Sequence, residues 1–219
     1  MRRHLGVALL VVLFAAGGSV AMAGTAGKPI TYQFDFGYSM VQGKPGDVFD
    51  DGWTIGFGSV IRPWPKKPLG IRWDLAYDWW DVNTGNLPPS ADGGQIHVDD
   101  GDGNQWSLRA GLQFESAGDK VKFIGGVGIG GYRLHANLTN SVLVPGYICD
   151  PYYWWYCYPG LVEGDIILSD KTLTKFGYYA TAGVSFPLAN SDIYIEAQYH
   201  WVNVEKYFET VPIVVGWRF

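Results

Sequence analysis

The chain has 219 residues, of which 47% are hydrophobic, 16% aromatic and only 17% charged, and its mean hydropathy is +0.00. A disordered chain would have few aromatic residues and more charge, and a nucleic-acid binder would have a basic surface rather than a net charge of −5. The mean hydropathy is also too low for a bundle of membrane helices. Apolar residues diluted by 30 Gly and by polar residues are typical of a membrane β-barrel.

The first 23 residues have the parts of a secretory signal peptide. A positive start is followed by an apolar run at Leu5–Ala16 and by a small-residue cleavage site at Ala21–Ala23. We expect residues 1–23 to be removed, which leaves one barrel domain at 24–219 with a net charge of −7, because the removed part contains two Arg and no acid. The alternative is an uncleaved anchor, for which the apolar run is short.

Period-two alternation of apolar and polar residues dominates the chain from Ile30 to its end. Such alternation is typical of strands with one apolar face and one polar face. Two adjacent glycines, Gly130 and Gly131, shift the phase of the pattern, and we expect a β-bulge or a kink there. The eight predicted strands are Ile30–Met40, Gly52–Arg62, Leu69–Asp81, Gln105–Ser116, Val121–Gly130, Phe176–Phe186, Ile193–Trp201 and Val211–Phe219.

The connections between these strands alternate between short and long. The short ones are Pro63–Pro68, Ala117–Lys120 and Pro187–Asp192, and the long ones are Val41–Asp51, Val82–Asn104 and Asn137–Lys171. Membrane barrels have short periplasmic turns and long extracellular loops. The sequence therefore predicts an all-β fold, an eight-stranded antiparallel up-and-down transmembrane β-barrel with both termini in the periplasm.

Alternation alone does not decide which face of the barrel points outward. A soluble barrel would expose its polar face, and a wall that meets water is normally charged. The polar face here is mostly Gly, Ser, Thr and Gln, so we expect it to line the lumen while the aromatic face meets lipid. Amphipathic aromatic rings near strand ends fit the girdles of a membrane barrel. These rings are Trp53, Trp79, Trp106, Trp201 and Trp217.

The polar face contains five basic and five acidic residues. An eight-stranded barrel is just wide enough for side chains to fill, so unpaired charges inside it would be costly and we expect a paired network. A narrow ion path is the functional interpretation, and a structural polar plug is the favoured alternative. The predicted lumen network is Asp35, Arg72, Asp74, Asp78, Arg109, Glu115, Glu196, His200 and Arg218, with Arg62 and Lys122 completing the basic set.

The chain resembles the OmpA/OmpX-like eight-stranded outer-membrane β-barrel proteins of Gram-negative bacteria. The signal peptide, the eight alternating segments, the unequal loops and the ending Val211–Phe219 support this resemblance. It implies a location in the cell outer membrane, with outer-membrane lipid and lipopolysaccharide as partners. It also implies that the outer-membrane assembly machinery reads Trp217 and Phe219. Members of this group include membrane-stabilising, adhesive, complement-evading and lipid-modifying proteins, so the resemblance does not select an activity.

Two segments partly match known enzyme and metal motifs. Lipid A deacylases resemble serine hydrolases with a His-x-Ser-Asn motif, and the nearest match, His200–Asn203, has Val202 in place of the Ser nucleophile. Asp100 and Asp102 have the spacing of a calcium loop, but its twelfth position is Gly111 rather than Glu. We therefore predict no enzymatic activity, no metal site and no cofactor.

An aromatic segment between two cysteines is the most unusual part of the sequence. Export favours an oxidised Cys149–Cys157 pair. We predict a structural or surface-interaction protein that contacts an extracellular ligand through loop 137–171. In the alternative, this loop folds over its own barrel mouth or inserts at the outer interface, and a small pore or transport protein is the second functional candidate. The predicted contact residues are Tyr152, Tyr153, Trp154, Trp155 and Tyr156.

Overall fold

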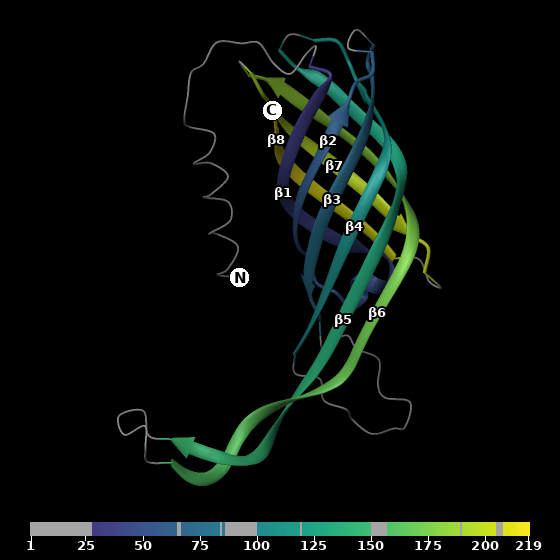
Figure 1. The fold of residues 1–219 in the computed structure, drawn as a ribbon. Coiled ribbons are helices and arrows are strands. Elements are labelled where there is room, and N and C mark those ends of the chain that lie inside the picture. The colour runs from purple at the N-terminus through teal and green to yellow at the C-terminus, as the bar shows by residue number, and fades with distance from the viewer. Residues whose placement is uncertain are drawn as a thin grey trace.

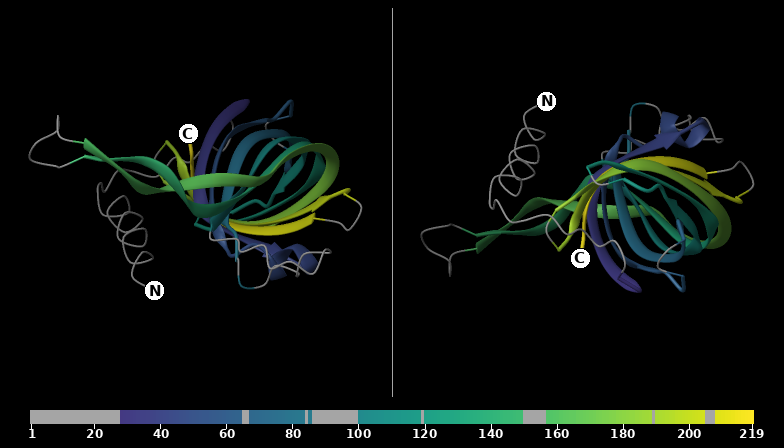
Figure 2. Two further views of the ribbon diagram at one scale, coloured as in Figure 1. Left: turned by 90° about the horizontal axis from the view of Figure 1, so that it is seen from below. Right: turned by 90° about the horizontal axis from the view of Figure 1, so that it is seen from above.

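Eight antiparallel strands form a closed barrel in the computed structural model, which describes residues 28–64, 67–83, 85, 100–118, 120–149, 157–188, 190–204 and 208–219 (Figure 1). Each strand pairs with the next along the chain, and the first pairs with the last, so that the strands form a ring (Figure 2). The strands are β1 Ile30–Gln42, β2 Gly52–Ile61, β3 Leu69–Asp81, β4 Asp100–Glu115, β5 Lys122–Cys149, β6 Cys157–Pro187, β7 Asp192–Val202 and β8 Phe208–Arg218.

The predicted fold class, an eight-stranded antiparallel up-and-down barrel, is therefore confirmed. The segment between β1 and β2 contains a short 3-10 turn, η1, at Lys44–Asp47. Within the described ranges, no helix has both the length and the apolar character that a bilayer crossing requires.

Alternation along each strand separates a polar interior from an apolar outer wall. In β7 the inward side chains of Glu196 and His200 are buried, whereas the outward side chains of Ile195 and Tyr199 are exposed. The other strands follow the same rule, because successive side chains of a strand point to opposite faces. A soluble barrel has the reverse arrangement, and its exposed wall would be charged. An outer wall of exposed Phe, Leu, Ile, Trp and Tyr is one that lipid covers.

Of the bulge or kink predicted at Gly130 and Gly131, the bulge is wrong. Both residues keep regular register with β4 and β6, and the only register shift between β5 and β6 lies between Leu138 and Thr139. Inward and outward positions therefore continue in phase, and the apolar Tyr132 points into the barrel, where it is fully buried. The lumen has room for this ring because a Cβ at Gly177 would lie 2.8 Å from its Cε2 atom.

Other inward glycines have the same role as Gly177. The three atoms nearest to a Cβ at Gly216 would all belong to the side chain of Tyr194. A Cβ at Gly111 would contact the Val127 carbonyl oxygen and would lie 2.7 Å from the hydroxyl oxygen of Tyr179. The sequence predicted that a face rich in Gly, Ser, Thr and Gln lines the lumen, and these contacts show that the glycines make room there for large side chains.

The long connection predicted at Asn137–Lys171 is wrong for most of its length. Strands β5 and β6 stay paired far beyond the barrel, up to the register pair Cys149 and Cys157, and we call residues 137–149 and 157–171 the ribbon (Figure 1). The aromatic residues 152–156 lie outside the described residues, and so do the side chains of the two cysteines. The disulfide therefore stays a prediction.

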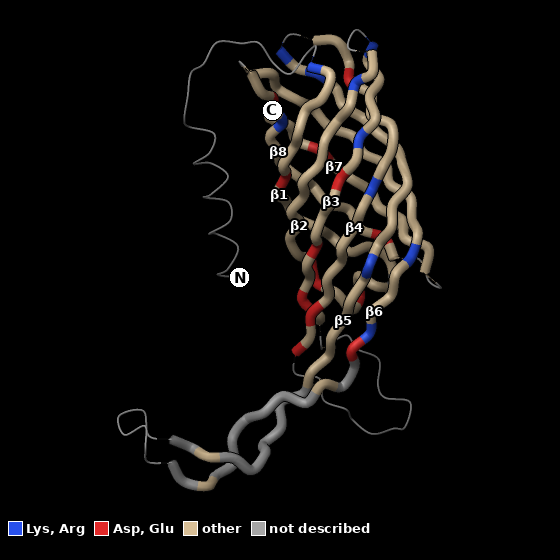
Figure 3. The backbone as a smooth tube through the Cα atoms, in the orientation of Figure 1, with Lys and Arg blue, Asp and Glu red and all other residues tan. Residues whose placement is uncertain are grey.

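The two ends of the barrel differ in what they contain. The terminus end includes the start of β1 and the end of β8, where the Tyr32 amide donates to the Phe219 carbonyl and the Phe219 amide donates to the Tyr32 carbonyl, both at 2.9 Å. Residues 1–27, with the predicted signal peptide, lie outside the described residues. We call the opposite end the ribbon end, and Asp and Glu gather there near the ends of the strands (Figure 3). Asp81, the last residue of β3, lies opposite Asp102 of β4, and the amide of Asp50 donates to the Asp81 carbonyl.

Candidate functional site

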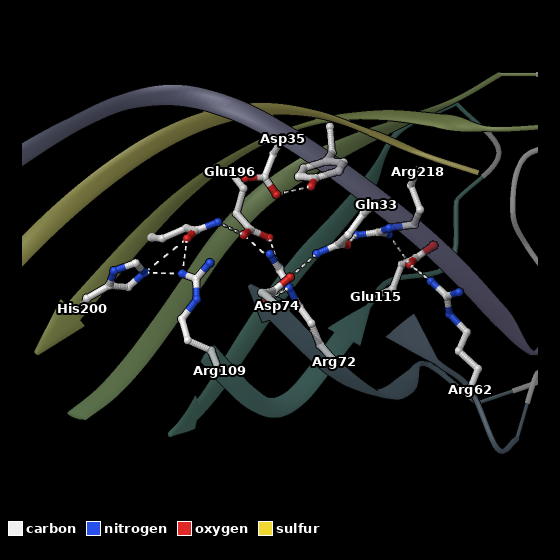
Figure 4. A network of polar contacts seen from close by, with 12 residues as sticks. Gln33, Asp35, Arg62, Arg72, Asp74, Arg109, Glu115, Glu196, His200 and Arg218 are labelled. Carbon is white, nitrogen blue, oxygen red and sulfur yellow. Dashed lines mark hydrogen bonds and ion pairs between the residues drawn. The ribbon is translucent and has the colours of Figure 1, made fainter. Parts of the chain in front are cut away.

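A chain of charged side chains crosses the lumen around Arg72, which lies on β3 and is 1% exposed (Figure 4). Its Nε donates to Oδ2 of Asp74 at 2.7 Å, and its Nη1 donates to Oε2 of Glu196 on β7 at 2.7 Å. Gln33 on β1 donates from Nε2 to Oδ1 of Asp74 at 2.6 Å, and Gln198 donates to Glu196 at 2.9 Å. One guanidinium therefore bridges two buried carboxylates, and two amides satisfy further lone pairs.

The network continues toward the ribbon end through Arg109 on β4. Its Nη1 donates to Oε1 of Gln198 at 2.6 Å and contacts Nε2 of His200 at 2.5 Å. Because a guanidinium has donors only, Nε2 of His200 must accept, which leaves the imidazole proton on Nδ1. That nitrogen lies 3.3 Å from the hydroxyl of Thr210 on β8. His200 is therefore a neutral link between Arg109 and Thr210.

A second cluster lies near the terminus end, around Glu115 at the end of β4. Arg62 donates to Oε2 of Glu115 at 2.5 Å, Arg218 donates to the same oxygen at 3.1 Å, and Nζ of Lys122 lies 3.1 Å from Oε1. Lys122 also lies 3.9 Å from Asp192, which is fully buried. Asp192 was assigned from the sequence to a turn, so the lumen contains one acid more than the sequence analysis counted.

Two predicted network residues bind elsewhere in the lumen. Asp35 accepts from the Tyr194 hydroxyl at 2.9 Å, and Asp78 accepts from Nε2 of Gln105 at 3.1 Å. The partners Gln33, Tyr194 and Gln105 were not singled out from the sequence, although the alternation places all three on the inward face. The structure thus places all nine predicted lumen residues inside the barrel. Seven of them belong to one bonded network, because Arg218 donates to Oε1 of Gln33 at 3.3 Å and so joins the Glu115 cluster to the Arg72 network. Asp35 and Asp78 bind outside it.

No family model matches the sequence, and no curated protein matches it. Among solved structures, Neisserial surface protein A is similar, with a TM-score of 0.53 and 17% identity over 87% of this chain and 96% of that one. The chain has the OmpA/OmpX-like eight-stranded barrel fold. Ail of Yersinia pestis, in complex with the heparin analogue sucrose octasulfate, gives a TM-score of 0.45 and 18% identity over 87% of this chain and 99% of that one. OprG of Pseudomonas aeruginosa gives a TM-score of 0.47 and 11% identity over 90% of this chain and 99% of that one.

An apolar cluster covers the polar network at the ribbon end of this barrel. Trp80 on β3 packs 5.5 Å from Phe208 on β8, ring centre to ring centre, and Phe49 from the β1–β2 segment lies 6.4 Å from Trp80 and 6.1 Å from Phe208. Because these side chains come from β1, β3, β5, β7 and β8 and from the β1–β2 segment, the cluster extends across the mouth. We call it the apolar lid, and its members are Val41, Phe49, Trp80, Tyr132, Val202 and Phe208.

The apolar lid was not predicted from the sequence, because its residues lie at inward positions, where polar side chains were expected, or in a predicted loop. The signal available was the pair Trp79-Trp80, since adjacent residues of a strand point to opposite faces and one of the two rings must enter the barrel. Trp80 is 1% exposed, and its indole Nε1 donates to the hydroxyl of Ser39 at 3.2 Å.

The geometry around His200 bears on the enzyme question. Thr210 provides a hydroxyl next to this imidazole that the sequence motif had not indicated. Both side chains are at most 1% exposed, and Val202 of the same motif belongs to the apolar lid. A substrate ester has no access to such a pair, and Arg109 already binds the nitrogen that would act as base. In the described part of the chain, no group of three His, Cys, Asp or Glu residues is placed to hold a metal ion.

Proposed function

We propose that this protein is a non-enzymatic barrel of the Gram-negative outer membrane with a structural or surface-interaction role, and that its lumen is plugged. The apolar outer wall supports a membrane location, because covering exposed apolar side chains with lipid lowers the free energy of the protein. The predicted signal peptide and the unequal strand connections favour an orientation with the termini in the periplasm and the ribbon end outside the cell. The observation that supports the interaction role best is the ribbon.

The ribbon extends the β5–β6 pair beyond the barrel, up to Cys149 opposite Cys157. A paired ribbon holds its tip at a fixed distance from the membrane and spends less conformational entropy on binding than an unpaired loop of equal length. Two cysteines directly opposite each other in an antiparallel pair have backbones close enough for a disulfide. Tyr and Trp at 152–156 provide large contact area with few rotatable bonds, which favours recognition of an extracellular ligand.

The plugged lumen is the second part of the proposal. Arg72, Arg109 and Glu115 each bind more than one lumen side chain, so an ion crossing the barrel would have to displace several buried bonds. The apolar lid adds a layer without polar partners for an ion. Recordings across planar bilayers test this part: the refolded protein should give no reproducible channels. Channels that change when Asp74 or Arg109 is neutralised would overturn the plug and support a pore instead.

The interaction role is tested on bacteria that display the full chain. Residues 152–156 are replaced by Gly and Ser, and attachment is measured to a panel of immobilised glycans and matrix proteins. We expect at least a tenfold loss of attached cells, while the heat-modifiable gel mobility of the barrel is unchanged. Lys67→Gln, at the opposite end of the barrel, is the matched control and should attach normally. Equal attachment by the replaced variant, or no attachment by the wild type to any surface, would overturn the role.

A further inference from the structure

The outer wall changes its chemistry in steps toward the ribbon end, along strands β4, β5 and β6. The apolar part of the wall ends at Leu108 and Phe176, which are 61% and 69% exposed and flank Gly131 in the register. The next outward position of β5 is Arg133, and the one after it is His135. Successive outward positions are two residues apart, or about 7 Å. A cationic zone therefore begins directly where the apolar wall stops.

The cationic zone contains a groove of about 270 Å³, lined by Asn104, Trp106, Arg133, His135 and Thr172. Trp106 and Arg133 are direct cross-strand neighbours, and so are Asn104 and His135. The imidazole of His135 is held in place, with Nδ1 3.1 Å from the Thr172 hydroxyl. The groove thus combines a guanidinium, an imidazole, an amide and a hydroxyl with one exposed indole ring.

Arg133 provides the guanidinium of this groove, and among the described residues no carboxylate forms an ion pair with it. Carboxylates lie farther out, at Asp102 and at Asp170, but it is His135 whose Nδ1 lies 3.4 Å from Asp170. Elsewhere in the barrel the guanidiniums of Arg62, Arg72 and Arg218 are bonded to carboxylates. An exposed guanidinium beside a Trp ring offers a fork of donors for a planar or tetrahedral anion.

We propose that this groove binds the phosphate of a lipid headgroup in the outer leaflet, an inference that rests on the proposed membrane location. Phosphate matches the donors of Arg133 and His135, and Trp106 is the residue type that lies at the headgroup level of a bilayer. The acyl chains of the same lipid cover Leu108 and Phe176 directly below. A soluble phosphate would make no use of that apolar surface, so the groove selects a phosphate attached to hydrocarbon.

The acidic side chains above the groove set its upper limit. A second groove of about 420 Å³ follows toward the ribbon end, and its lining includes Asp81, Asp100 and Asp102. These carboxylates repel a phosphate, so the bound group is confined to the zone of Arg133 and His135. The order of the outer wall is therefore apolar, cationic and then acidic, which matches acyl chains, phosphate and the water beyond it.

The test uses the full chain, refolded in a non-ionic detergent and titrated with three probes by calorimetry. Short-chain phosphatidic acid should bind, whereas inorganic phosphate and the matching diacylglycerol should not bind at the same concentrations. Arg133→Gln should weaken phosphatidic acid binding about tenfold, equivalent to about 1.4 kcal/mol. Lys67→Gln is the matched control, because Lys67 also lies beside an aromatic ring, 5.2 Å from the centre of Trp64, but outside this groove.

Each other outcome overturns the proposal. Equal binding of inorganic phosphate would show a site for free anions, and equal binding of diacylglycerol would show an apolar site without phosphate recognition. An unchanged affinity in Arg133→Gln, or an equal loss in Lys67→Gln, would remove the groove from the interaction. Heat-modifiable mobility of both variants verifies the fold. The proposed membrane role fails separately, if the chain expressed in cells is recovered without detergent from the soluble fraction.

Discussion

Removal of the Arg72 guanidinium is the sharpest test of the lumen network. In Arg72→Met the side chain keeps most of its length, but Asp74 and Glu196 lose their shared cation. Both carboxylates are at most 2% exposed, so bulk water does not replace the lost bonds. Removing one partner of a buried ion pair destabilises a protein by about 3–5 kcal/mol, because an uncompensated charge remains. Gln33 and Gln198 still donate to the two carboxylates, so we expect about 3 kcal/mol.

The assay is urea unfolding of the protein refolded into phospholipid vesicles, followed by Trp fluorescence and by gel mobility of unheated samples. Lys67→Met is the control, because this Lys is exposed outside the lumen and outside the Arg133 groove, and we expect a change within about 0.5 kcal/mol. Adding Glu196→Gln to Arg72→Met should recover part of the loss, since it removes one of the two orphaned charges. A loss below about 1 kcal/mol in Arg72→Met would show that water solvates the lumen carboxylates, and the argument for a sealed network would be refuted.

Three further predictions concern other parts of the chain. Gly216→Ala should lower the free energy of unfolding by about 1–3 kcal/mol, because the new Cβ would overlap the Tyr194 ring. The loss should be smaller in a Tyr194→Ala background, and an equal loss in both backgrounds would contradict the packing. Purified protein unfolded without reductant should show no reactive thiol, and two free thiols would exclude the pairing of Cys149 with Cys157. Phe49→Ala should lower the free energy of unfolding by about 1–3 kcal/mol, because the ring is half-buried. The variant should still form no channels in planar bilayers, and new channels would show that the apolar lid alone seals the barrel.

The sequence predicts this fold well wherever a strand separates two different environments. From Ile193 to Trp201 the inside and the outside differ, so alternation revealed the strand and its faces. In the ribbon, both faces of the strands leave the barrel and no such difference exists, so the pattern disappears although the pairing continues. Strand β4 likewise begins at Asp100, before the predicted Gln105, in a stretch of Asp and Gly that is typical of loops.

The sequence could predict which residues point into the lumen, but not which of them contact one another. The inward phase identified Arg72 and Glu196, but their contact joins β3 to β7 across the barrel, and residues so far apart in sequence have no spacing signal. The apolar lid was not predicted from the sequence for a different reason. Its rings belong to apolar residues at inward positions or in a predicted loop, and the contacts of Tyr132 with Gly177 and of Trp80 with Phe208 show that the interior accepts them.

The pairing of β1 with β8 has a consequence for how the barrel forms. Tyr32 and Phe219 exchange two backbone hydrogen bonds across almost the whole length of the chain, whereas every other strand pair joins neighbours in sequence. Loop-closure entropy makes this seam the costliest pairing and the last to form. Until it closes, both edge strands present unpaired amides and carbonyls, which hydrocarbon cannot satisfy. Insertion and closure are therefore expected to be one concerted step, with Phe219 among the final residues to be ordered.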